Sequence, residues 1–294
     1  MLEPYEAVLA RIAAMPMHAV QLRPTGRAQG WVLAEAVPAA QAVPRCDVAL
    51  VAGVAVASRL VADATPWLPV PLPAGARVAP GQALPAGCDA VLPPALLDAD
   101  GAAIAQLAPG ANVRRAASAA APGASVVATG TRLGPLAIAA LHAAGVVSVA
   151  VRPNTVPANG TVLPFPWLTP AEAEPARGIA IEQAEDSGLG DALRLPADLF
   201  GAIAAALALG VPLLRRLSGR APMPDSTCVL DRRVTSPPGL ASVVLLRAGA
   251  GTACPLPWGS LAALAEATHF AIVPSASEGW PGGTAIPAQS LDCG

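Results

Sequence analysis

From Val20 to Val151, glycine and proline divide the sequence into apolar runs of only a few residues each. Valine, alanine and leucine dominate these runs, and short apolar segments between turn residues are typical of β-strands. The pattern predicts a mainly β structure for this half of the chain, arranged as a small barrel or sandwich. The runs are GWVLAEAV, ALVAGVAVA, ARVAP, DAVLP and SVVATG.

Three segments have the pattern of helices. Glu3–Met15 has apolar residues at helical spacing, and Pro16 ends it. Pro135–Pro153 begins as a helix at a proline, stops at a glycine and continues as a strand. Leu195–Gly219 is strongly apolar and carries two arginines in its last turn, where the helix dipole favours positive charge. We therefore expect one helix at the start, one in the first half and one in the second.

The longest apolar run, Leu199–Leu214, contains Pro212 and is shorter than the roughly 20 residues that span a bilayer. It predicts a buried helix and no membrane partner. Before it, Asn154–Pro196 is rich in proline, glutamate, alanine and glycine, and only ARGIAIEQ has the pattern of a strand. After it, Asp225–Gly294 returns to short strands around the helical segment GSLAALAEAT, which predicts a separate β-barrel-like module.

The charge of the chain excludes several kinds of function. All 18 basic residues are arginine, so neither a Schiff base nor a phosphate-loop lysine is available. A net charge of −2 gives no electrostatic reason for a nucleic-acid partner. The five cysteines form no C-x-x-C pair, which indicates reduced thiols. The acidic N-terminus, with Glu3 and Glu6, has no secretion-signal pattern, and we expect a cytoplasmic protein.

Six polar residues of the first half are candidates for binding a ligand. Arginine pairs with carboxylates and phosphates through bidentate hydrogen bonds. The alternative interpretation is structural, because a lone acid in an apolar stretch is commonly a turn or cap residue, and paired arginines on strands are commonly solvated or ion-paired. The six are Asp47, Arg77, Asp89, Asn112, Arg114 and Arg115.

Neither a metal site nor a catalytic residue is expected. His18, His142 and His269 are far apart in the sequence, and each lies in an apolar setting, so their spacing does not suggest a shared metal ion. No motif such as G-x-S-x-G marks a nucleophile.

Several segments, taken in order, resemble motifs of one family. GWVLAEAV (Gly30–Val37) is similar to G-R-V-L-A-E-D-V, and ARVAPGQALPAGCDAVLP (Ala76–Pro93) is similar to R-I-M-T-G-A-P-L-P-x-G-A-D-A-V-V. LPADLFGAIAAALALGVPLLRRLSG (Leu195–Gly219) is similar to the L-P-G-N-P-V-S helix. The family is that of the molybdopterin molybdenumtransferases, which includes the gephyrin E domain and inserts molybdate into adenylylated molybdopterin.

The acidic loop of that family, P-x-F-D-N-S-A-M-D-G-Y-A-V, corresponds to VPRCDVALVAGVAVASRL (Val43–Leu60). The first acid is retained as Asp47. The second, which the resemblance places near the metal-transfer site, falls on Ala52. Further family positions that have lost their characteristic residues are Pro80, Ser118, Ala119 and Leu240.

Without its second acid, this loop has the composition of a strand after Asp47. Val48, Leu50 and Val54 fall on one face at strand spacing, and Gly53 is the expected tight or bulged point. The lack of polar side chains predicts burial on both faces, so an acid introduced at Ala52 should destabilise the protein.

The central domain of the family, with the T-G-D-E-L and G-G-V-S-x-G segments that cradle the pterin, should lie between Arg152 and Leu195. Only about forty residues are present there, too few for a doubly wound sheet. The resemblance therefore implies an α+β, mainly β fold in which the molybdopterin-binding α/β domain is largely missing. Its parts are an N-terminal helix, linker domain and β-rich domain (1–152), a reduced remnant with one helix (153–220) and a C-terminal β-barrel-like domain (221–294).

The resemblance implies a pseudoenzyme of molybdenum cofactor biosynthesis, a homodimer that acts as a binding or assembly factor in the maturation of molybdoenzymes. Its expected partner is a molybdoenzyme or another protein of cofactor biosynthesis, and no cofactor is expected. The sequence leaves one alternative open: an active enzyme, or a carrier of molybdopterin or molybdate, with a rearranged site among Asp47, Asp89, Asn112 and the arginines.

Overall fold

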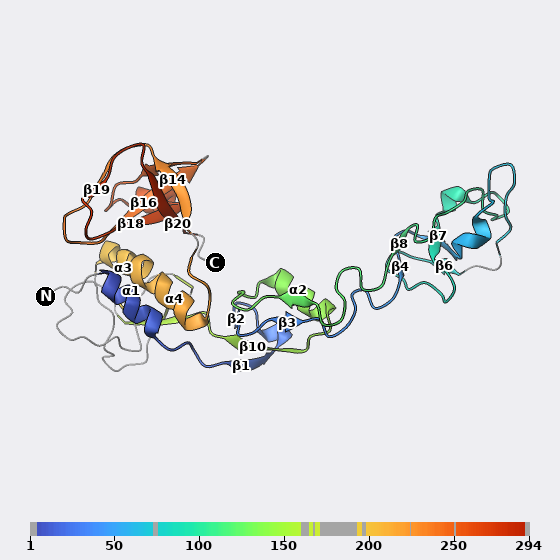
Figure 1. Ribbon diagram of the computed structural model, residues 1–294, viewed down its shortest axis with the longest axis horizontal. Helices are drawn as coiled ribbons and strands as arrows, with labels where there is room; N and C mark the ends of the chain where they lie inside the picture. Colours follow the sequence, from blue (N-terminus) through green and yellow to red (C-terminus); the bar gives the residue numbers. More distant parts are fainter. Residues whose placement is uncertain are drawn as a thin grey trace.

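The computed structural model describes residues 5–72, 76–159, 165–166, 168–170, 193–195, 198–223, 225–249 and 251–291. The molecule is elongated and has three parts along its length (Figure 1). A body at one end holds the C-terminal barrel and the long helix, a small sheet with α2 lies in the middle, and an arm of short strands forms the other end.

The C-terminal part is a closed five-stranded barrel, which confirms the expected β-barrel-like module. Its inward residues alternate with outward ones, as in β14 (Ser226–Leu230), where Cys228 and Leu230 are buried. Around the barrel the strand order is β14, β17 (Thr252–Pro255), β16 (Ser242–Gly249), β18 (His269–Val273) and β20 (Ala285–Ser290). The module also contains helix α5 (Leu261–Glu266) and the strand pair β15 (Val234–Thr235) and β19 (Gly279–Trp280).

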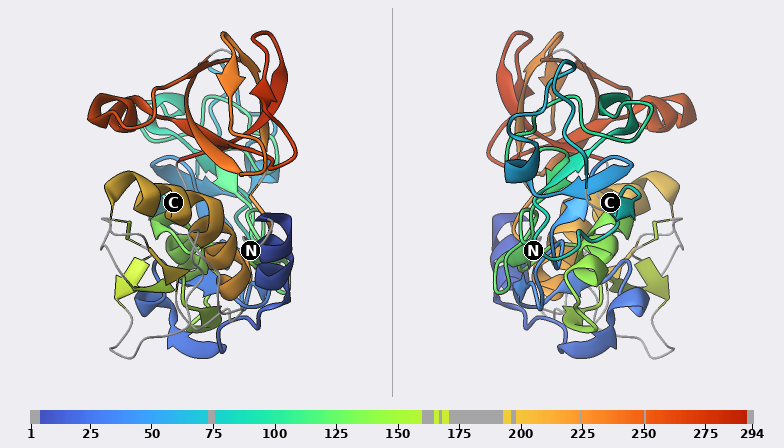
Figure 2. Two further views of the ribbon diagram at one scale, coloured as in Figure 1. Left: turned by 90° about the vertical axis from the view of Figure 1, so that its left-hand side faces the viewer. Right: turned by 90° about the vertical axis from the view of Figure 1, so that its right-hand side faces the viewer.

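Residues 199–218 form one continuous apolar helix beneath the barrel (Figures 1 and 2). It consists of α3 (Leu199–Ala205), a π-helical turn (Ala206–Gly210) and α4 (Val211–Ser218). The Asp198 carboxylate caps its start by accepting the Gly201 N–H, and the left-handed Gly219, at φ 75°, ends it.

Pro212 explains how α1 (Tyr5–Ala14) is held against this helix. Proline has no N–H, so it cannot donate the usual helical hydrogen bond to the carbonyl of Ala208, four residues earlier. The Tyr5 hydroxyl donates to that carbonyl instead, at 3.0 Å. Burial of Tyr5, with a smaller contribution from the charge of Glu6, raises the pKa of the phenol, which keeps the donor protonated.

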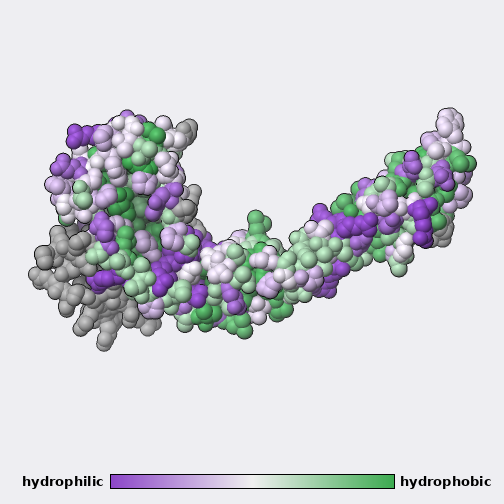
Figure 3. Space-filling view, in the orientation of Figure 1, coloured by the Kyte–Doolittle hydropathy of each residue, from purple (hydrophilic) through white to green (hydrophobic). Residues whose placement is uncertain are grey.

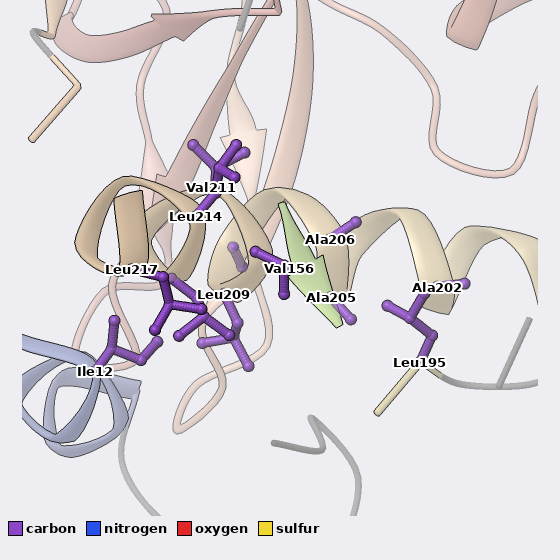
Figure 4. Packing of buried hydrophobic residues seen from close by; sticks show 12 residues of the cluster. Ile12, Val156, Leu195, Ala202, Ala205, Ala206, Leu209, Val211, Leu214 and Leu217 are labelled. Atoms are coloured by element: carbon purple, nitrogen blue, oxygen red, sulfur yellow. The ribbon is translucent and has the colours of Figure 1, made fainter. Parts of the chain in front are cut away.

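Apolar side chains cover the long helix on several sides. Ile12 of α1 packs with Leu209 and Leu217 on one side, and Val156 packs on another (Figure 4). On the barrel side, Leu207 forms a buried cluster with Leu245 and Phe270. The helix is therefore the common core of the body. It is also long and apolar enough to cross a membrane by length and composition alone, but more than half of it is buried inside the fold.

The middle of the chain keeps more of a sheet than the sequence analysis predicted. β11 (Val156–Asn159) pairs in parallel with β12 (Leu168–Pro170) and with β13 (Leu193–Arg194). These strands have only two to four residues and include two prolines, so they have no strand periodicity to detect. The strand predicted for ARGIAIEQ lies outside the described residues.

The first half forms small separate sheets, so the predicted barrel or sandwich is wrong for the described residues. The strands are two to four residues long, apart from β10, because turns with left-handed glycines interrupt them. In the middle of the molecule, α2 (Pro135–Ala143) lies beside the sheet β1 (Gln21–Pro24), β10 (Ser148–Arg152) and β2 (Val32–Leu33) and the pair β3 (Val37–Pro38) and β9 (Ser125–Val127). The arm holds the pair β4 (Val48–Ala49) and β8 (Val113–Arg114) and the sheet β6 (Arg77–Val78), β5 (Gly53–Val56) and β7 (Ala90–Leu92).

Tyr5→Phe should lower the free energy of unfolding by about 1–3 kcal/mol, because it leaves the buried Ala208 carbonyl without its donor. The same substitution should cost less in a Pro212→Ala background, where residue 212 regains an N–H. Urea unfolding of the four proteins of this cycle measures the coupling. An equal cost in both backgrounds would show that the hydroxyl does not replace the missing helical hydrogen bond.

Candidate functional site

Asp47, the retained acid, lies directly before β4 in the arm, and both of its carboxylate oxygens are occupied. Oδ1 accepts the backbone N–H of Ala116 at 2.8 Å, and Oδ2 accepts Nη1 of Arg115 at 2.9 Å. The Ala116 N–H, together with the Arg115 guanidinium, lowers the pKa of Asp47 below its ordinary value. Asp47 therefore ties the start of β4 to the segment that follows β8.

Asp89 makes a similar clamp at the end of β5. Its Oδ1 accepts the Ser58 N–H at 2.6 Å, and its Oδ2 accepts the Ser58 hydroxyl at 2.9 Å. The Ser58 N–H lowers the pKa of Asp89 most, followed by the Ser58 hydroxyl and the positive charge of Arg115. Sequence reasoning missed Ser58 because nothing in its own neighbourhood marks it, and its partner lies 31 residues away.

Asn112 bridges backbone segments. It adopts a left-handed conformation, at φ 61°, which asparagine tolerates better than most residues. Its Nδ2 donates to the Val91 carbonyl at 2.9 Å, and its own carbonyl accepts the Leu50 N–H at 2.8 Å. Like the two acids, Asn112 stabilises the local chain path.

The structure brings four of the six candidate residues together and leaves two apart. Arg115 directly follows β8, bonds Asp47, lies beside Gly110 and acts electrostatically on Asp89. Asn112 directly precedes β8. Arg77 on β6 and Arg114 on β8 are exposed. Neither side chain makes a hydrogen bond or ion pair within the part of the chain that the structure describes.

The loop around Asp47 is not buried on both faces, which corrects the sequence-based expectation. Ala49 and Ala55 are buried at 1% and 3% exposure, while Leu50 is 49% exposed. The chain bends between β4 and β5, so one strand period does not run through both. Gly53 was correctly expected to be a tight point, because a Cβ there would clash with the Leu92 carbonyl.

The positions that have lost family residues lie on the surface. Ala52 is exposed in the bend between β4 and β5. In the described ranges no group of three or more His, Cys, Asp or Glu residues is arranged to hold a metal ion. The other changed positions, all exposed, are Pro80, Ser118, Ala119 and Leu240.

The three histidines lie in different parts of the molecule. His18 precedes β1, and its Nε2 lies 3.0 Å from the Thr155 carbonyl. His142 is in α2, and His269 is in the barrel, where its Nδ1 lies 3.0 Å from the Thr268 hydroxyl.

The N-terminal half of the chain matches a known protein family. The family model described as MoeA N-terminal region (domain I and II) matches residues 3–145, which include α1, the arm and α2. Residues 3–145 are therefore similar to the N-terminal region of MoeA proteins. This confirms the resemblance read from the collinear motifs. A search of curated proteins finds no match.

Solved structures of MoeA proteins share the fold. The crystal structure of a molybdopterin biosynthesis MoeA protein from Pyrococcus horikoshii OT3 is 16% identical, with a TM-score of 0.72 over 99% of this chain and 100% of that one. A second structure from Pyrococcus horikoshii is 19% identical, with a TM-score of 0.67 over 99% of each chain. A molybdenum cofactor biosynthesis protein from Pyrococcus furiosus is 15% identical, with a TM-score of 0.57 over 99% of this chain and 100% of that one.

The hydrogen bonds of the Asp47 and Asp89 carboxylates predict that the stability of the protein decreases at low pH. Both carboxyls have a folded-state pKa below the ordinary 3.8, so their stabilisation is present above about pH 4 and is lost as the pH falls through the folded-state values. Asp47→Asn and Asp89→Asn should lower the melting temperature at pH 7, and the difference from the parent should shrink towards pH 2.

Differential scanning calorimetry between pH 7 and pH 2 measures this dependence. Asp63→Asn is the matched control, because Asp63 is exposed and has no hydrogen bond in the described part of the chain, so its effect should be small at every pH. A difference for Asp47→Asn that stays constant down to pH 2 would contradict the ionised clamp.

Because Ala52 is exposed, an acid at this position should not destabilise the protein, contrary to the expectation from the sequence. Ala52→Asp should change the free energy of unfolding by less than about 0.5 kcal/mol. Ala55→Asp, three residues on, buries a carboxylate and should cost about 3 kcal/mol or more. Urea unfolding of both variants tests whether Ala52 is exposed. A large loss of unfolding free energy in Ala52→Asp would indicate that the side chain at position 52 is buried.

Proposed function

We propose that this MoeA-like protein acts in molybdenum cofactor biosynthesis as a non-catalytic binding or assembly factor. It works in the cytoplasm as a homodimer, without a cofactor of its own, and its partner is a molybdoenzyme or another protein of the same biosynthesis. The observation that carries the proposal is the state of Asp47, the one acid kept in the matching loop. Its two oxygens already bond Arg115 and Ala116, so it stabilises the loop.

Three further features support this proposal. Ala52 stands, exposed, where the resemblance places a second carboxylate near the metal-transfer site. Asp89 has both oxygens bonded to Ser58. The central part has only about forty residues between Arg152 and Leu195, where the family carries its pterin-binding segments. A protein with these changes keeps the scaffold and lacks the second acid and the pterin-binding segments of the family.

The alternative is an active enzyme or a carrier of molybdopterin or molybdate. The exposed Arg77 and Arg114 favour it, since a free guanidinium can bind an oxyanion through paired hydrogen bonds. Substituting each with Gln and measuring molybdate binding by calorimetry distinguishes the carrier from the assembly factor.

The chemistry is tested with purified protein, adenylylated molybdopterin and molybdate. We expect no AMP release and no metal insertion above the rate without protein, and Ala52→Asp should restore neither. A catalytically competent MoeA protein serves as the positive control. Turnover by the parent that disappears in Asp47→Asn would contradict the proposal and establish an enzyme.

The assembly role is tested in cells that lack the gene. Molybdenum content of the molybdoenzymes should fall, and the parent and Asp47→Asn should restore it equally when both are present at equal soluble levels. Failure of Asp47→Asn alone would assign chemistry to this carboxylate.

A further inference from the structure

A groove lies where helix α3 meets the barrel, far from the arm. It is formed by Ala204 of α3, the end of β15, the start of β16 and the connection from β17 to α5, and its volume is about 460 Å³. This volume falls in the range of small-molecule sites. We call it the helix–barrel groove. It lies outside residues 3–145, so it does not rest on the proposed function.

The walls of the helix–barrel groove are mostly apolar. Val243, Val244 and Leu256 come from the barrel and its loop, and Ala204 comes from the helix. Trp258 closes one end, with its ring against Phe200 at 6.1 Å between centroids and 60° between planes. Trp258 remains 42% exposed, so an aromatic surface is open to a ligand. Figure 3 shows hydrophobic surface where the barrel meets the helices.

The contact between the long helix and the barrel, next to the groove, is a well-packed hydrophobic cluster. Leu207, Leu245 and Phe270 are buried together between helix and barrel, and Val243 and Leu256, which line the groove, pack against that cluster. A site on such a shared core is held in shape before any ligand binds, which favours affinity.

The groove has few polar side chains, and all of them can donate hydrogen bonds. Arg233 is the charged residue in the lining, and it makes no hydrogen bond or ion pair within the described ranges. The Ser242 hydroxyl accepts from Ser236 at 2.8 Å, which leaves its own O–H free to donate. Thr235 adds a second hydroxyl. A guanidinium with two hydroxyl donors matches an anionic oxygen group.

The neighbouring Arg232 differs in its contacts. Its guanidinium donates to the Cys254 sulfur and lies 3.6 Å from an Asp231 oxygen. Arg232 therefore already has partners on the barrel, whereas Arg233 lines the groove and has no counter-ion among the described residues.

We propose that the helix–barrel groove binds a small organic carboxylate with an apolar or aromatic body. The apolar part lies along Val243, Leu256 and the Trp258 ring, and the carboxylate pairs with Arg233. Arg233 is exposed. A neutral hydrocarbon gains nothing from this cation and a bare inorganic anion gains nothing from the apolar wall, so both should bind more weakly than the carboxylate.

The probe is 4-phenylbutyrate, and its amide is the uncharged counterpart of the same shape. Calorimetry with the full chain should show one saturable site for the carboxylate and about tenfold weaker binding of the amide, because the charge-assisted hydrogen bonds are lost. Arg233→Gln should weaken carboxylate binding about tenfold and leave amide binding unchanged. Arg232→Gln, the matched control, should bind the carboxylate like the parent.

A second variant places a larger side chain in the groove without touching the arginine. Ala204→Leu should abolish binding of both probes while the melting temperature stays near that of the parent, which separates blocked binding from loss of fold. Equal affinity for carboxylate and amide, equal effects of Arg232→Gln and Arg233→Gln, or no binding by the parent would each overturn the proposal.

Discussion

A 20-residue helix with apolar side chains on nearly every side must be covered on nearly every side, and the body of this protein is arranged to do so. α1 covers one flank, β11 another and the barrel a third. The proline within the helix leaves one backbone carbonyl without a helical donor, and the single tyrosine of the chain supplies it. The same helix also carries Ala204 into the helix–barrel groove, so the core of the body also shapes its binding surface.

The arm follows a different rule. Its strands are two to four residues long, too short to be stable by themselves, and side-chain hydrogen bonds tie them together. Asp47 joins segments 69 residues apart, and Asp89 joins segments 31 residues apart. Asp47, the retained acid of the family motif, therefore stabilises the arm through its hydrogen bonds. This is a physical reason for an acid at position 47 even though position 52 is alanine.

Strong local patterns were sufficient to predict several elements. The proline start and glycine stop of Pro135–Pro153 predicted α2 and β10, and short apolar runs after Asp225 predicted barrel strands such as β16. Elements without a local pattern were missed. β11, β12 and β13 are too short to show a period, and the burial of Ala49 and Ala55 in place of Leu50 depends on a bend that composition does not encode. Ser58 has meaning only through its distant partner, Asp89.

The measurement that tests the central role of the helix most directly is native-state hydrogen exchange of the full chain, followed by mass spectrometry. If the body depends on this helix, peptides from residues 199–218 should be among the slowest to exchange and should open together with α1 and the barrel strands β16 and β18. Peptides of the arm should exchange earlier. Exchange of the helix at the rate of the arm, while the barrel stays protected, would contradict this account.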